Sequence, residues 1–126
     1  MVAAPPPSPP AIVRAWSRDL NANHNAAAAA LFAPGARVIQ PGVDVRLTAK
    51  LAIAFNESLP CGGRITRLLR KGDRVTATFV LTERPGHTCD GPGQTAAALF
   101  VVQKGLITRW QQVAVPKAPK PPPARA

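Results

Sequence analysis

The chain has 126 residues, of which 46% are hydrophobic, and it carries a formal net charge of +10. This length allows one domain with one core and excludes several independent domains. The longest apolar run, residues 26–32, is far shorter than the roughly 20 residues that a membrane-spanning helix needs. We therefore expect one folded domain and no transmembrane segment.

Both ends of the chain are rich in proline. We predict a disordered N-terminus over residues 1–9 and a Pro/Lys-rich disordered tail over residues 116–126, because such segments favour solvated, extended conformations. The folded domain is then residues 10–115. The N-terminus also lacks the basic start and apolar stretch of an intact secretory signal, and a signal already removed would leave no trace here.

Two helices are predicted at the start of the domain. Ser8 can cap the first, whose opening turn tolerates proline and whose apolar residues recur on one face until the helix ends near residues 21–23. A cap at Asn23 or Asn25 begins the second helix. We expect the alanine run to carry it through Phe32 to the Pro-Gly pair that follows.

A third helix is predicted after a short pair of strands. Thr48 is its cap, and Pro60 closes it. Leu51, Phe55 and Leu59 form its expected apolar face.

The second half of the domain changes to the two-residue period of strands. The four predicted strands are rich in Val, Ile, Thr and Phe and are separated by glycine-containing turns: residues 64–70, 73–84, 95–104 and 106–113. Helices followed by strands predict an α+β fold, in which a curved mixed or antiparallel sheet wraps as a cone around the N-terminal helices. The open mouth of such a cone is a site for small ligands.

Two segments carry a resemblance to a known family. Residues 11–23 and residues 30–41 resemble the opening of ketosteroid isomerases and SnoaL-like polyketide cyclases, which belong to the nuclear transport factor two-like superfamily with its cystatin-like fold. Residues 105–110 are similar to the last strand of these proteins. The resemblance implies the same cone over residues 11–113, but this superfamily contains enzymes, ligand binders and interaction modules alike.

The catalytic residues of the isomerases are replaced in this chain. The resemblance places the oxyanion-stabilising tyrosine on Trp16, the general-base aspartate on Gln40 and the second aspartate on Ala97. An amide cannot move a proton between carbons as a carboxylate does, and an indole N–H is a much weaker acid than a phenol. We therefore do not expect ketosteroid isomerase activity, and we favour a function other than catalysis.

Two other functions stay open. A SnoaL-like enzyme of the isomerase, cyclase or epoxide hydrolase type would need a carboxylate in the cone, and among the six acidic residues only Asp44 and Glu57 could lie near its mouth. We expect both on the solvated surface, since functional carboxylates are the minority. The other alternative is a protein-interaction module of the cell envelope.

The resemblance also suggests a pocket. Its predicted lining is Trp16, Gln40, Phe55, Ala97, Leu99, Thr108, Trp110 and Gln112. Ile107, like Arg109, would lie on the convex face. Two indoles and two amides would hold a small hydrophobic or ring-shaped molecule by stacking and hydrogen bonds, although both Trp residues could equally be plain core. The family further suggests a homodimer through the convex face of the sheet, with Phe100 and Ala98 near the contact.

Cys61 and Cys89 are the only cysteines, and both lie in predicted loops. One disulfide between them would stabilise the domain by about 3 to 4 kcal/mol. The pattern around them resembles exported actinobacterial members of the superfamily, which favours an extracytoplasmic or secreted protein, with the cytoplasm as second choice. A metal site formed by the two cysteines with His87 and His24 would lack the usual paired spacing of ligands. The sequence supports a Cys–His nucleophile even less than it supports this metal site. We therefore expect no metal and no cofactor.

The positive charge gathers partly on one predicted hairpin, at Arg64, Arg67, Arg70, Lys71 and Arg74. Aromatic residues do not alternate with these arginines and Tyr is absent, so we do not expect nucleic-acid binding. We interpret the charge as a solvated basic surface, one that would suit contact with cell-envelope polyanions.

Overall fold

The computed structural model describes residues 5–117, so the disorder predicted for residues 1–4 and 118–126 lies outside the described range. Within that range the elements follow the predicted α+β order: α1 (Pro9–Asn21), α2 (Asn25–Ala30), β1 (Phe32–Gln40), β2 (Val43–Arg46), α3 (Ala49–Ser58), β3 (Gly62–Lys71), β4 (Arg74–Thr82), β5 (Thr95–Gln103) and β6 (Leu106–Val113). None of the described helices has the length and hydropathy to cross a bilayer.

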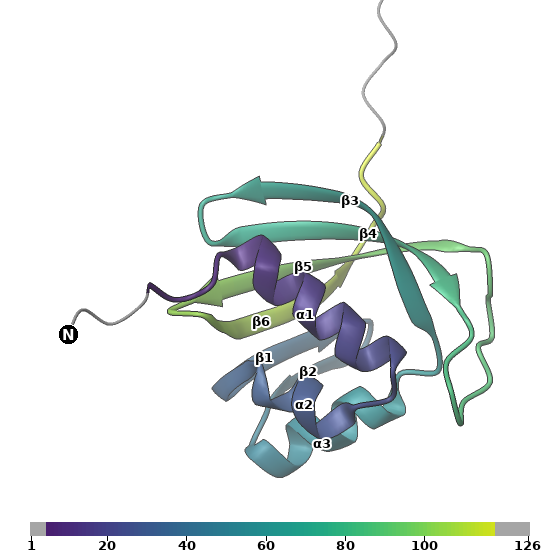
Figure 1. The fold of residues 1–126 in the computed structure, drawn as a ribbon, viewed down its shortest axis with the longest axis horizontal. Coiled ribbons are helices and arrows are strands. Elements are labelled where there is room, and N and C mark those ends of the chain that lie inside the picture. The colour runs from purple at the N-terminus through teal and green to yellow at the C-terminus, as the bar shows by residue number, and fades with distance from the viewer. Residues whose placement is uncertain (1–4, 118–126) are drawn as a thin grey trace, which may run out of the picture.

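The strands form one curved sheet in the order β2-β1-β6-β5-β4-β3. Every neighbouring pair is antiparallel except β1 and β6, which run parallel. The sheet bends around α1, and α2 and α3 lie together beside its β1–β2 end (Figure 1). This is the cone of mixed strands around helices that the sequence predicts.

Helix α1 forms the centre of the core. The Ser8 hydroxyl accepts a hydrogen bond from the Ala11 backbone N–H at 3.3 Å, as a capping residue does. Four apolar residues that recur every three or four positions are buried against the sheet: Ile12, Val13, Trp16 and Leu20. The spacing of these residues places one complete face of the helix inside the cone.

The predictions for the other two helices need correction. Helix α2 ends at Ala30, because Phe32 pairs with Ile107 at the start of β1 and the Ile107 N–H donates to the Leu31 carbonyl oxygen. Sheet pairing thus overrides the helical run. In α3 the cap at Thr48 is confirmed, but Leu51 is 49% exposed; the buried residues are Ala52 and Asn56, one turn apart.

A β-bulge shifts the inward face of β6. The pairing of β5 with β6 slips between Val101 and Val102, so Ile107 lies opposite Val102 and is fully buried in the core. Our placement of Ile107 on the convex face is therefore wrong, since strict alternation ignores the bulge. Phe100 and Ala98 are also buried core residues, which corrects their placement at a convex dimer contact.

Arg84, just after β4, is the one buried charged side chain among residues 5–117, at 2% exposure. Its guanidinium donates hydrogen bonds to the backbone oxygens of Leu20, Asn56 and Leu59 at 3.0, 2.8 and 2.5 Å and to the side-chain oxygens of Asn23 and Asn25. The carbonyl groups belong to the ends of α1 and α3, where the helix dipole favours a cation. Burial lowers the pKa of Arg84, and the Glu57 carboxylate opposes this, yet arginine stays charged.

After β6 the chain crosses the convex face of the sheet. Nη1 of Arg67, on β3, donates to the Lys117 backbone oxygen at 3.4 Å. Four extended residues reach about 13 Å, close to the three strand spacings of about 14 Å between β6 and β3. This segment, the C-terminal strap (residues 114–117), is yellow in Figure 1.

Candidate ligand-binding cavity

A cavity of about 290 Å³ opens inside the cone, between α1, the start of β3 and the adjoining ends of β1, β4, β5 and β6. Its walls are mainly apolar, and the larger side chains are Trp16, Leu20, Phe79 and Trp110. Trp16 and Leu20 both contribute because they lie one turn apart on the inward face of α1. Apolar walls with a few polar groups are typical of small-molecule sites.

The cavity includes five of the eight residues predicted to line it: Trp16, Gln40, Ala97, Trp110 and Gln112. The other three lie elsewhere. Phe55 packs behind the wall, with its ring centroid 5.1 Å from that of Trp110. Leu99 pairs with Gln111 on the convex side. Thr108 lies in the bulge region, where its hydroxyl donates to the Val101 carbonyl oxygen at 3.2 Å.

The two Trp residues differ in their hydrogen bonds. Trp16 Nε1 donates to Asn56 Oδ1 at 2.8 Å, and the Asn56 amide in turn donates to the Ala52 carbonyl oxygen. Trp110 Nε1 is also buried, but it has no partner within residues 5–117. A buried donor without an acceptor costs about 1 to 3 kcal/mol, so Trp110 favours an acceptor from outside the chain.

Two amides lie side by side where the cavity opens. The parallel register joins Ile39 to Gln111, so the next residues, Gln40 and Gln112, are neighbours on the concave face, and both line the cavity. Each amide can donate and accept hydrogen bonds. No Lys or Arg of the described residues lines the cavity, so its polar groups do not favour an anionic ligand.

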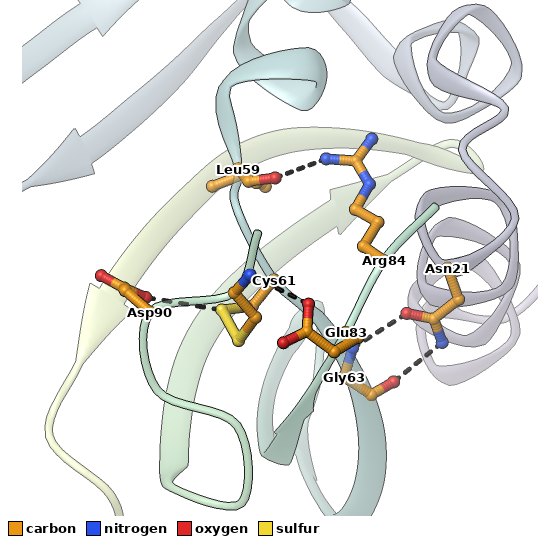
Figure 2. Close-up of a disulfide and its surroundings, with 8 residues drawn as sticks. Asn21, Leu59, Cys61, Gly63, Glu83, Arg84 and Asp90 are labelled. Carbon is orange, nitrogen blue, oxygen red and sulfur yellow. Dashed lines mark hydrogen bonds between the residues drawn. A yellow bond between two sulfur atoms is a disulfide. The ribbon is translucent and has the colours of Figure 1, made fainter. Parts of the chain in front are cut away.

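The predicted disulfide is present beside this opening. Cys61 and Cys89 are bonded, with their Cα atoms 4.5 Å apart, which fixes the loop after β4 to the start of β3 (Figure 2). The same loop is held by the Cys89 N–H, which donates to the Glu83 carboxylate at 3.1 Å. Cys61 itself lines the cavity, so the disulfide is part of the wall.

Asp90 is the acidic residue that the described chain brings to the cavity. Its Oδ1 lies 3.5 Å from Cys61 Sγ (Figure 2), a contact rather than a hydrogen bond because a disulfide sulfur carries no hydrogen. Asp90 is exposed, and our expectation that only Asp44 and Glu57 could lie near the mouth of the cone missed it. The available signal was its position directly after Cys89.

Asn21 holds the first residues of β3 against the end of α1. Its side chain accepts from the Gly63 N–H and donates to the Gly63 carbonyl oxygen, both at 2.8 Å (Figure 2). A Cβ atom at Gly62 would lie 2.6 Å from Asn21 Oδ1, so a side chain there would displace this clamp. Both glycines line the cavity, and the close approach therefore shapes its opening.

Asp44 and Glu57 lie on the exposed surface and outside the cavity lining, as the solvated-surface interpretation expects. Asp44 accepts hydrogen bonds from Arg37 at 2.8 and 2.5 Å, and this contact holds the pKa of the Asp44 carboxyl below its usual range. The Glu57 backbone oxygen lies 2.8 Å from His87 Nε2. An enzyme that uses either carboxylate inside the cone is not supported.

The alternative metal site does not assemble in residues 5–117. Both cysteines are bonded to each other, so neither offers a thiolate. The ring nitrogens of His87 lie 2.9 and 2.8 Å from the backbone oxygens of Pro85 and Glu57. Asp90 is the remaining member of the cysteine cluster, and a single carboxylate does not make a metal site.

The comparison with known proteins found similar folds among solved structures. The chain matches no protein-family model and no curated protein. It is similar to an NTF2-like protein of unknown function from Cytophaga hutchinsonii, with a TM-score of 0.71, 15% identity, and coverage of 90% of this chain and 93% of that one.

Two further structures carry isomerase names. A candidate ketosteroid isomerase from Kribbella flavida has a TM-score of 0.65 and 26% identity, covering 93% of this chain and 84% of that one. A ketosteroid isomerase-like protein from Catenulispora acidiphila, in complex with trimethylamine, has a TM-score of 0.65 and 22% identity, covering 83% and 85%. The chain has the cone-shaped α+β fold of nuclear transport factor two-like and ketosteroid isomerase-like proteins.

Proposed function

We propose that the cavity binds a small hydrophobic, ring-shaped molecule that carries an oxygen acceptor. The observation that carries the proposal is the buried Nε1 donor of Trp110, which has no acceptor within residues 5–117 although Trp110 lines the cavity. Nε1 itself has almost no accessible surface, so a carbonyl, ether or hydroxyl oxygen of a ligand would satisfy it after a small shift of the neighbouring side chains. The aromatic walls would bury the ring, and the amides of Gln40 and Gln112 would orient it.

Binding without catalysis agrees best with these groups. Trp16 and Gln40 line the cavity. The resemblance assigns to them the positions of the acidic tyrosine and the general-base aspartate of the isomerases, and neither residue can replace that chemistry. A related protein of this fold is in complex with trimethylamine, so the fold accommodates small organic molecules. An interaction module remains the alternative, for which we would expect a cone filled by its own side chains.

Asp90 supports a second candidate function, an enzyme that uses this carboxylate at the cavity. The candidate differs from the predicted enzyme because it needs neither Asp44 nor Glu57. Once a ligand is known, conversion of that ligand by the wild type, lost in Asp90→Asn with binding retained, would establish it. Binding without conversion in both proteins would eliminate it.

The ligand proposal is tested by measuring the thermal shift of the oxidised protein with steroids, polyketides and terpenoids. Each compound is paired with an analogue that lacks the oxygen acceptor. A ligand that binds the native state raises the melting temperature. We expect Trp110→Phe to weaken binding of the oxygenated compound about fivefold to tenfold and to leave the affinity for its analogue unchanged. Gln111→Ala, next to Trp110 but on the convex face, is the control.

Two outcomes would contradict parts of the ligand proposal. Equal losses for both members of a pair would remove the role of the Trp110 donor. The absence of any shift in a well-folded protein would remove the ligand proposal and favour the interaction module.

We also propose an extracytoplasmic location, which the disulfide supports because such bonds persist in oxidising compartments. Alkylation of the protein in intact cells should find Cys61 and Cys89 blocked. Free thiols in the native host would place the protein in a reducing compartment.

A homodimer through the convex face of the sheet remains a prediction. Its contact would have to use outward residues such as Leu99 and Val101 in place of Phe100 and Ala98. The C-terminal strap already covers part of this face. Sedimentation equilibrium at micromolar concentration tests the prediction, and a single monomeric species would reject it.

A further inference from the structure

One row of residues crosses the convex face of the sheet from edge to edge and is almost entirely basic. Successive register pairs join one residue from each strand: Arg46, Arg37, Arg109, Val101, Arg74 and Lys71. With neighbouring strands about 4.8 Å apart, this basic row is about 24 Å long. The residues beside it in sequence, Val38, Trp110 and Val75, are buried in the core, so alternation turns the row outward.

The charges of the basic row are largely unpaired. Arg37 forms an ion pair with Asp44 at 2.5 Å, and the other four cations form none within residues 5–117. Like charges stand directly opposite one another at Arg37 and Arg46 and again at Lys71 and Arg74. Such cross-strand pairs are destabilising, and an anion lying along the row would relieve the repulsion.

The chemistry of the row favours phosphate. Four of its five cations are arginines, whose planar guanidinium forks bind phosphate oxygens in pairs. The face offers no ring on which a base could stack, because all aromatic side chains belong to the core or pack against it. A row across a curved surface also suits a flexible chain better than a rigid duplex or a flat bilayer.

We propose that the basic row is a binding site for an extended phosphate polymer without bases. Each strand presents one residue of the row to the polymer, which would lie across the strands. The site is separate from the cavity, since the row and the cavity occupy opposite faces of the sheet, and it does not depend on the ligand proposed there.

The test compares two triple variants of the full chain that lose the same charge. The row variant carries Arg46→Gln, Arg109→Gln and Arg74→Gln. The control variant carries Arg14→Gln, Arg18→Gln and Lys50→Gln, which are exposed on α1 and α3, on the helical side of the molecule. Titration with long-chain inorganic polyphosphate, with pyrophosphate as the short probe, gives the affinities at several salt concentrations.

We expect the row variant to lose about tenfold to a hundredfold in affinity for polyphosphate and the control variant less than about threefold. The slope of log affinity against log salt should fall by about two in the row variant, as three phosphate contacts disappear. Long chains should bind more tightly per phosphate than pyrophosphate does. An Arg→Lys version of the row variant should recover part of the lost affinity, since it restores charge but not the guanidinium fork.

Three outcomes would overturn the proposal. Equal losses in both variants would mean that net charge alone attracts the polymer. Equal affinity per phosphate for pyrophosphate would mean that the row does not act as a unit. Tighter, row-dependent binding of single-stranded DNA or of anionic lipid vesicles would assign the surface to a different partner. Circular dichroism and melting temperature confirm that both variants remain folded.

Discussion

The two faces of the sheet are made of alternating residues from the same strands, yet they differ completely in chemistry. The concave face holds aromatic rings, two amides and the cavity, with no Lys or Arg of the described residues in its lining. The convex face carries the basic row. Arg109 and Trp110 are adjacent in the chain but belong to different sites, so each site can be altered without changing the other.

Arg84 differs from the cations of the convex face because it is buried. Its replacement should give the largest loss of stability. Arg84→Met removes the hydrogen bonds to three backbone oxygens at the helix ends. The oxygens of Leu20 and Asn56 still accept from backbone N–H groups, whereas that of Leu59 loses its donor. We expect the free energy of unfolding to fall by about 3 to 5 kcal/mol. Urea unfolding measures it. Arg109→Met, on the exposed face, should change stability by less than about 0.5 kcal/mol; similar losses at both positions would contradict the distinction between a buried and a surface cation.

The disulfide at the cavity opening gives the second largest effect. Replacing Cys61 and Cys89 together by Ser should lower the free energy of unfolding by about 3 to 4 kcal/mol, because the unfolded chain regains the freedom of a closed loop. Reduction of the wild-type protein should give the same loss. A melting temperature that does not respond to reductant would show that the bond is absent in solution.

The same substitution at the two Trp residues sharpens the contrast within the concave face. Trp16→Phe leaves Asn56 Oδ1 without its donor and should cost about 1 to 3 kcal/mol beyond the change in packing. Trp110→Phe removes a donor that has no partner in residues 5–117 and should cost less. Urea unfolding of both variants gives the difference, and equal losses would mean that Trp110 Nε1 is hydrogen-bonded in solution.

The smallest effect concerns the ion pair on the convex face. The hydrogen bond from Arg37 lowers the pKa of Asp44, so the pair stabilises the folded state above the unfolded pKa of about 3.9. This contribution is lost as the pH falls through the lower pKa of the folded state. The stability difference between wild type and Asp44→Asn should therefore shrink toward zero in acid and in high salt. Asp73→Asn, which breaks no ion pair of the described chain, is the control.

Local signals in the sequence were sufficient for most of the fold. The caps at Ser8 and Thr48 and the limits of β6 are confirmed, because capping and strand alternation are decided within a few residues. The end of α2 and the inward turn of Ile107 could not be predicted. Both depend on the pairing of β6 with distant strands, and no local pattern encodes that register.

The site was only partly predictable for a similar reason. The resemblance placed Trp16, Gln40 and Trp110 at the cavity because they lie on regular elements. Asp90 and Arg84 were missed because their positions depend on a loop that follows β4, and loop conformation here is fixed by the disulfide and by the helix ends. Burial of an arginine without a carboxylate partner also runs against composition-based expectation.

The sheet order has a consequence for how this chain is made. Strand β6 is the last to be synthesised, yet it lies between β1 and β5. Until it has left the ribosome, the sheet can exist only as two pieces with open edges, and the parallel contact between β1 and β6 joins nearly opposite ends of the domain. The sheet can therefore be completed only after β6, the last strand of the domain, has been synthesised.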